Sequence, residues 1–262
     1  MKTMLIIILV TSAQIIGAQS QDIPYGVNEQ AGRYCNVGDA NIYYEVYGEG
    51  EPLLMIHGNG GSFSCFENQV EEFSKHFKVI LVDCRGRGNS SYQKGVELTF
   101  DLQVEDISLF LEKLNIQKTN IVGWSDGGII GLLLAIKHPE KVNKLATSGA
   151  NIFPEGVIHL DDMKKTVLDL ENKNSNHEND LAIDLINLDI KYPNLNFTNL
   201  KVIKSKTLII AGDHDEIKND HTLKMFESIP NAQLAILPNS SHSALIENAN
   251  IFNPIVLKFL RD

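Results

Sequence analysis

The fold can be inferred outward from one segment, residues 119–137, which reads TNIVGWSDGGIIGLLLAIK. An apolar strand pattern leads into Gly123-Trp124-Ser125-Asp126-Gly127, and an apolar helical pattern follows. A serine between a strand and a helix, with glycine two positions before and after it, is typical of a nucleophile elbow. The two glycines remove Cβ atoms from a very tight turn, so we expect Ser125 to project from it at a strained backbone angle.

Short β-rich runs alternate with helical patterns on both sides of this segment. Strands are predicted at 42–47, 53–57, 79–83, 119–123, 144–148, 207–212 and 233–237, and helices at 100–114, 127–137 and 251–260. Most of these strands are continuously apolar, which indicates burial on both faces and therefore parallel pairing. The alternation predicts an α/β sheet with helices on both faces.

The alternation breaks between residues 150 and 200, where two amphipathic helical patterns replace the strands. Their apolar stripes are Leu160, Met163, Val167 and Leu170, and then Leu181, Leu185 and Leu188. A long insertion in an α/β sheet commonly lies over the site, so residues 151–200 are predicted to form a helical cap. A plain helical crossover with an acidic, solvated face is the alternative interpretation.

Composition bounds the class of protein and of partner. The chain has 262 residues, 43% of them hydrophobic and 21% charged, which is typical of a globular protein that can bury a full core. The formal net charge of −10 provides no basic footprint, so a nucleic-acid partner is not expected. The three cysteines form no CxxC pattern, and no metal or cofactor is expected.

The N-terminus has the pattern of a secretory signal over residues 1–20. Lys2 precedes the apolar run Met4–Val10, and cleavage is expected after Ser20 or Ala18, leaving one domain over 21–262. A transmembrane anchor is the competing interpretation, but polar residues leave the run short of the ~20 apolar residues of a span. We therefore expect a secreted or periplasmic protein with no stable membrane anchor once the signal is removed.

A serine hydroxyl needs a base, and the base needs an orienting acid. His242 is the candidate base, because it falls in a Ser- and Asn-rich loop, 238–243, after the last predicted strand. Another strand ends in Gly212-Asp213-His214-Asp215, so both Asp213 and Asp215 qualify as the acid. The chain order serine, acid, histidine is the order expected after a nucleophile elbow.

Donors for an oxyanion are predicted in the glycine-rich loop His57-Gly58-Asn59-Gly60-Gly61 and at the elbow. We expect the backbone amides of Asn59 and Trp124 to form the oxyanion hole, and His57 to brace the loop. A phosphate-binding loop is the alternative, but the GxxxxGK[ST] pattern is missing.

These motifs together resemble the α/β-hydrolase-fold serine hydrolases, from about Tyr34 to the C-terminus. The resemblance implies an eight-stranded, mostly parallel sheet with helices on both faces and a small helical cap, and it selects Asp215 as the acid. Serine as the nucleophile disfavours the haloalkane dehalogenase and epoxide hydrolase branches. The sequence departs from the family at Arg87, where histidine or an aromatic residue is common, and at Ser241, where glycine is common. We expect Arg87 to affect the packing of its loop and not the chemistry.

The expected activity is hydrolysis of a small-molecule ester or acyl substrate through Ser125, His242 and Asp215, with an acyl-enzyme intermediate. The same triad could act as an aminopeptidase, lactonase, thioesterase, carbon–carbon bond hydrolase or perhydrolase. The alternative outside enzymes is a ligand-binding receptor that retains vestigial hydrolysis.

Overall fold

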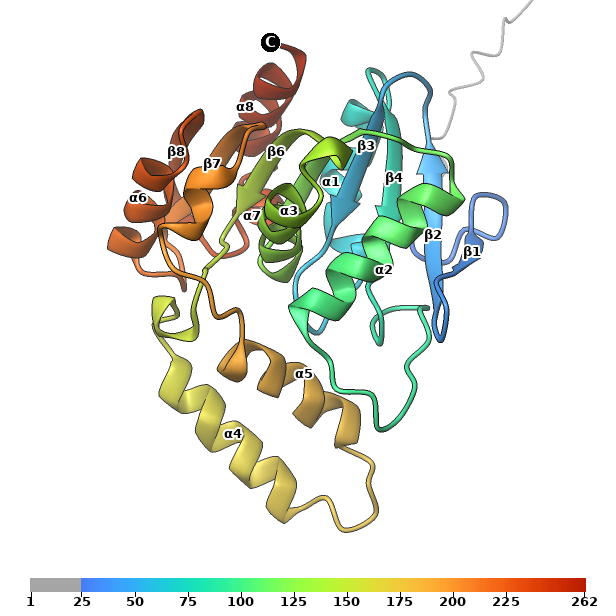
Figure 1. Cartoon of the computed structure of the whole chain (residues 1–262), viewed down its shortest axis with the longest axis vertical. Coiled ribbons are helices and arrows are strands. Elements are labelled where there is room, and N and C mark those ends of the chain that lie inside the picture. The colour runs from blue at the N-terminus through green and yellow to red at the C-terminus, as the bar shows by residue number, and fades with distance from the viewer. Residues whose placement is uncertain (1–24) are drawn as a thin grey trace, which may run out of the picture.

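The computed structural model describes residues 25–262, which form one central sheet covered by helices (Figure 1). The strand order is β1-β2-β4-β3-β5-β6-β7-β8. The strands are β1 (Arg33–Asn36), β2 (Asn41–Tyr47), β3 (Pro52–Ile56), β4 (Lys78–Val82), β5 (Thr119–Trp124), β6 (Val142–Ser148), β7 (Lys206–His214) and β8 (Ala232–Ser241). The β1–β2 and β2–β4 pairs are antiparallel and all other pairs are parallel. The predicted eight-stranded, mostly parallel sheet is confirmed.

Helices cover both faces of the sheet, as the alternation predicts. They are α1 (Glu67–Phe73), α2 (Phe100–Lys113), α3 (Asp126–Lys137), α4 (Leu160–Asn172), α5 (Asp180–Lys191), α6 (Asn219–Ser228), α7 (Ala244–Glu247) and α8 (Ala249–Arg261). Side chains from α2, α3 and α6 belong to one apolar cluster, and side chains from α1, α7 and α8 belong to a second. The sheet therefore separates two cores.

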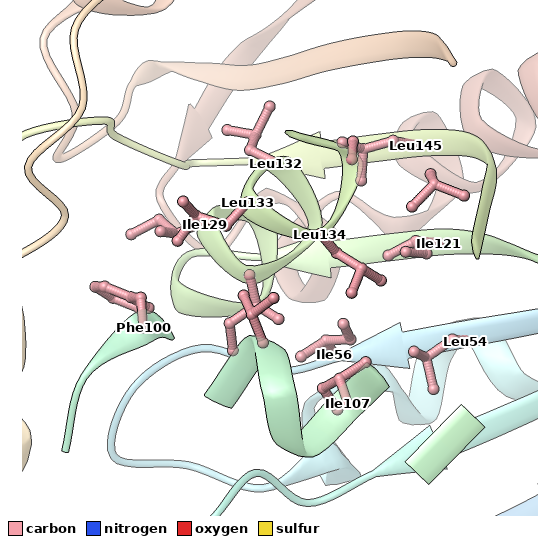
Figure 2. Close-up of a cluster of buried hydrophobic side chains, with 14 of the residues drawn as sticks. Leu54, Ile56, Phe100, Ile107, Ile121, Ile129, Leu132, Leu133, Leu134 and Leu145 are labelled. Carbon is pink, nitrogen blue, oxygen red and sulfur yellow. The ribbon is translucent and has the colours of Figure 1, made fainter. Parts of the chain in front are cut away.

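Helix α3 is the central helix of the first core. It packs against β5, β6 and α2, and for this reason it is apolar nearly all round. Figure 2 shows Leu134 of α3 on the side of Ile121 of β5 and Ile56 of β3, and Ile107 of α2 close to Ile56. The α3 residues Ile130, Leu132 and Leu134 are fully buried, and each contributes about 1.5–3 kcal/mol of transfer free energy. This packing fixes the first residue of α3, Asp126, and therefore also the position of Ser125 before it.

The predicted cap consists of α4 and α5, which are inserted between β6 and β7 and stand apart from the sheet as a helical pair (Figure 1). β6 and β7 pair directly with each other from Lys144↔Lys206 to Ser148↔Ile210. The insertion therefore leaves the sheet continuous beneath it.

No helix within residues 25–262 is long and apolar enough to cross a membrane. The predicted signal segment, residues 1–20, lies outside the described residues.

Candidate active site

Ser125 is the single residue between the end of β5 and the start of α3. Its backbone angles are φ 54° and ψ −118°, which confirms the expected strain at this position. Gly127 explains why the turn is possible, because a Cβ atom there would lie 1.9 Å from the carbonyl oxygen of Ile56. The buried strand on one side and the buried helix on the other hold the serine in this conformation.

The candidate acid and base follow two adjacent paired strands. His214 at the end of β7 pairs with Ser241 at the end of β8, so the next residues, Asp215 and His242, lie side by side. Nδ1 of His242 is 2.7 Å from Oδ1 of Asp215, and Nε2 of His242 is 3.0 Å from Oγ of Ser125. The structure thus brings the three predicted residues into one hydrogen-bonded chain.

Asp213, the second acid that the residue pattern allows, takes a different role. Its Oδ1 accepts a hydrogen bond from the amide of Ser240, at 3.0 Å. Asp215 is the acid that contacts His242, as the resemblance to the family implies.

The environment of His242 favours its protonated form. Burial disfavours the imidazolium, but the hydrogen bond and the charge of Asp215 outweigh burial, so the pKa of His242 is raised above its usual value. The side chain of Asp215 is only 1% exposed, and its carboxylate also accepts the amides of Ile217 at 3.0 Å and Gly212 at 3.3 Å. The acid is therefore held rigidly against the imidazole ring.

Two further groups hold the imidazole in place, and sequence reasoning missed both. The indole Nε1 of Trp124 donates to the carbonyl oxygen of His242 at 2.8 Å. Gly149, directly after β6, leaves room for the ring, because a Cβ atom there would lie 2.7 Å from Cε1 of His242. A glycine after a strand is too common a pattern to reveal this contact.

His57 braces the glycine-rich loop, as predicted. Its Nδ1–H donates to the carbonyl oxygen of Gly58 at 2.6 Å, and its Nε2 accepts the amide of Cys84 at 3.0 Å. Burial lowers the pKa of His57 to about 3, so the ring is neutral near pH 7 and both nitrogens are occupied. His57 is therefore unsuited to act as the base.

The predicted oxyanion donors need one correction. The amide of Ser125 donates to the carbonyl oxygen of Ser148, which pairs with Trp124 across the parallel ladder. Because amides alternate in direction along a strand, the Trp124 amide points the other way, toward β3. Asp126 is the first residue of α3, where an amide has no acceptor within its helix. The geometry favours Asp126 over Trp124 as a donor beside Ser125, together with Asn59.

A buried polar cluster lies next to this position. Nη2 of Arg87 contacts the carboxylate of Asp126 at 2.5 Å and donates to Oδ1 of Asn59 at 3.1 Å, and Nη1 donates to Gln103 at 2.5 Å. Arg87 and Asp126 are 3% and 2% exposed. Arg87 was expected to affect only the packing of its loop, but it contacts the residue that follows the nucleophile.

Within residues 25–262, no cluster of three or more His, Cys, Asp or Glu side chains has the arrangement of a metal site.

Comparisons with known proteins agree with this architecture. Residues 51–176 match the alpha/beta hydrolase fold family. A 2-hydroxy-6-oxononadienedioate/2-hydroxy-6-oxononatrienedioate hydrolase of Pseudomonas putida is 30% identical, over 85% of this chain and 92% of the relative. The enol-lactonase of Burkholderia xenovorans LB400 superposes with a TM-score of 0.73 at 23% identity, over 88% of this chain and 100% of that one. A hydrolase of Pseudomonas aeruginosa PA01 superposes with a TM-score of 0.77 at 22% identity, over 89% and 99% of the two chains. The chain belongs to the alpha/beta hydrolase family of enzymes.

Proposed function

We propose that the protein is a serine hydrolase that cleaves a small carboxylic ester through an acyl-enzyme intermediate. The observation that carries the proposal is the continuous chain of hydrogen bonds from Asp215 through His242 to Ser125. A serine with a base at hydrogen-bonding distance, and an acid that orients the base, is the arrangement that activates a hydroxyl for attack on an acyl carbon.

In the first half-reaction, Oγ of Ser125 bonds to the acyl carbon while Nε2 of His242 takes the hydroxyl proton. The carbon–oxygen bond to the alcohol then breaks, and the imidazolium gives its proton to the leaving alkoxide. Asp215 accepts the hydrogen bond of Nδ1–H throughout and stays ionised, so Nε2 remains the site of proton transfer.

In the second half-reaction, His242 removes a proton from water, and the resulting hydroxide attacks the acyl carbon. The bond to Oγ breaks, Ser125 recovers its proton from His242, and a carboxylic acid leaves. In both halves the amides of Asn59 and Asp126 hold the negative oxygen. One such donor is worth about 2.7–4 kcal/mol of transition-state stabilisation.

The decisive experiment replaces the nucleophile. Ser125→Ala should abolish hydrolysis of p-nitrophenyl acetate and labelling by a fluorophosphonate probe. Ser64→Ala, which changes an exposed serine outside the triad, serves as the control and should retain both. Retention of more than a few per cent of the activity by Ser125→Ala would show that another group performs the chemistry. A wild-type protein that binds small acyl compounds but resists the probe would favour the receptor alternative.

Carbon–carbon bond cleavage is the second candidate, because the relative from Pseudomonas putida is named for a 2-hydroxy-6-oxo-dienedioate substrate. Such a substrate carries two carboxylates. Arg87 lies beside the elbow, but its guanidinium is paired with Asp126. We therefore expect neutral esters to be better substrates than dioates. Comparing kcat/KM for p-nitrophenyl acetate and for a 2-hydroxy-6-oxo-dienedioate would decide between the two.

The remaining activities of the same triad are distinguished by the substrates that the protein turns over. Amino-acid p-nitroanilides report an aminopeptidase, thioesters a thioesterase, lactones a lactonase, and peroxyacid formation from acetate and peroxide a perhydrolase. The ester proposal requires the highest kcat/KM on oxygen esters.

We also propose that the protein is exported, from the signal pattern of residues 1–20. Expression of the full chain should yield a mature protein whose N-terminus begins after Ser20 or Ala18. An unprocessed N-terminus in a host competent for secretion would contradict the proposal.

A further inference from the structure

The cap helix α5 makes polar contacts with the predicted oxyanion loop, and Figure 1 shows it between α4 and the sheet. Nδ2 of Asn59 donates to Oδ2 of Asp189 at 2.7 Å and to the carbonyl oxygen of Leu185 at 2.7 Å. Oδ1 of the same amide accepts Nη2 of Arg87 at 3.1 Å and the amide of Gly60 at 2.8 Å. Both the nitrogen and the oxygen of the Asn59 side-chain amide are therefore hydrogen-bonded, and α5 provides the acceptors for the nitrogen.

The same carboxyl group of Asp189 also meets Asp126 at the elbow. The two carboxyl groups are close enough to influence each other's protonation, and the guanidinium of Arg87 contacts Asp126 at 2.5 Å and places a positive charge near Asp189. Two buried carboxylates beside each other, of which only one contacts a cation, favour retention of one proton. Arg87 contacts Asp126 directly, so the proton is placed on Asp189, which can then donate to Asp126.

The protonation behaviour of the pair agrees with this assignment. Burial, followed by the charge of Asp126, raises the pKa of Asp189 well above the usual value for an aspartic acid. Burial also raises the pKa of Asp126, although Arg87 opposes that effect.

We propose that Asp189 is a positioning residue for the oxyanion hole. From its place in the cap, Asp189 fixes the positions of Asn59 and Asp126 relative to each other. The proposal rests on the proposed esterase function, because Asn59 and Asp126 matter there through their backbone amides. Asp189 does not touch the reacting atoms. It accepts a hydrogen bond from the side chain of Asn59 and its carboxyl group interacts with that of Asp126, and a misplacement of about 1 Å at such a site can reduce the rate about 100-fold.

Raising the pH tests the interaction between Asp189 and Asp126, because it removes the proton that they share. The charged groups that face Asp189 are Arg87, from the loop after β4, and Asp126, from α3; His242 lies close enough to Asp126 to interact with its charge. Loss of the proton from Asp189 would place two carboxylates side by side with one cation, and their repulsion would separate α5 from the elbow. We therefore expect kcat to decline as the pH rises through the raised pKa of Asp189.

The experiment compares Asp189→Asn and Asp189→Ala with a control on the same helix, Asp184→Asn. Asparagine has the shape of the protonated acid, can donate to Asp126 and accept from Asn59, and does not ionise. Asp184 instead accepts a hydrogen bond from the hydroxyl of Tyr92. The readouts are kcat and KM on p-nitrophenyl acetate from about pH 6 to 10, the rate of fluorophosphonate labelling, and the melting temperature over the same range.

Asp189→Ala should lower kcat and the labelling rate roughly 10- to 100-fold, with a smaller change in KM. Asp189→Asn should stay near wild type at neutral pH and should lose the alkaline decline, both in kcat and in melting temperature. The control should behave as wild type. If Asp189→Ala does not fold, the pH dependence of Asp189→Asn tests the proposal.

Three results would overturn the proposal: Asp189→Ala with unchanged kcat, a change confined to KM, or an alkaline decline that persists in Asp189→Asn. A wild-type protein that hydrolyses no ester and resists the probe would instead refute the esterase function. In that case the positioning role would fall with it, whatever the variants show.

Discussion

Replacing Asp215 with asparagine tests how the acid assists the base. The carboxylate has two environments: Oδ1 accepts Nδ1 of His242 at 2.7 Å and the amide of Ile217 at 3.0 Å, whereas Oδ2 accepts the amide of Gly212 at 3.3 Å. An asparagine that keeps its oxygen in the Oδ1 position preserves two hydrogen bonds and loses the longer one. The opposite orientation sets an N–H₂ group against the amide of Ile217. We therefore expect the oxygen to remain on His242.

The magnitude follows from the charge alone if the tautomer is preserved. A carboxylate in contact shifts the pKa of its neighbour by about 1–3 units. Each unit corresponds to about 1.4 kcal/mol of imidazolium stabilisation, and Asp215 is too buried for water to replace it. Asp215→Asn should therefore lower kcat about 10- to 1,000-fold. Without the carboxylate the pKa of His242 falls, so the acid limb of the profile should move to lower pH.

The assay is the pH dependence of kcat and kcat/KM for p-nitrophenyl acetate, with Asp213→Asn as the matched control. Asp213 accepts the amide of Ser240 and not His242, so its substitution should change kcat by no more than about twofold. A loss of about 10⁴ in Asp215→Asn would show that the amide turned and reversed the tautomer. A loss below about threefold, or an acid limb that does not move, would refute the charge argument.

Three further predictions follow from the site and its supports. In the wild type, kcat/KM should fall on the acid side with a midpoint above the ordinary ~6.5, because the pKa of His242 is raised and only the neutral ring accepts a proton; a pH titration with a midpoint below about 6 would contradict it. Gly127→Ala should prevent the elbow from forming, because its Cβ would lie 1.9 Å from the oxygen of Ile56; soluble, fully active protein on expression would be inconsistent with this clash. Arg85→Met should lower the free energy of unfolding by about 3–5 kcal/mol, because it leaves Asp106, paired at 2.6 Å, as an uncompensated buried charge; urea denaturation measures this, and a loss under 1 kcal/mol would speak against it.

Much of the fold was predictable because its signals are local. The helix predicted over 100–114 is confirmed as α2, and the side chain of Thr99 caps it by accepting the amide of Leu102 at 3.1 Å. The short elements were missed: β1 has four residues, and α1 and α6 carry mostly polar residues whose period is weak. Such elements form because the sheet and its neighbours bury their few apolar side chains.

The site was predictable wherever a residue follows the end of a strand. Ser125, Asp215 and His242 all do so. The loop expected at 238–243 proved to be strand as far as Ser241, because β8 pairs with an irregular extension of β7 at His214. Contacts between distant segments left no pattern along the chain. Nothing in an amphipathic helix indicates that Asp189 meets the elbow while Asp184 meets Tyr92.

The direct pairing of β6 with β7 beneath the cap has a consequence for protein engineering. Because the amide of Leu195 donates to the carbonyl oxygen of Ile152 at 2.9 Å, the segments that lead into α4 and out of α5 lie side by side outside the sheet. A foreign helical hairpin grafted between those points would sacrifice no inter-strand hydrogen bond. Substrate preference could then be redesigned separately from the hydrolytic machinery, provided that the graft supplied a neutral acid or amide opposite Asn59.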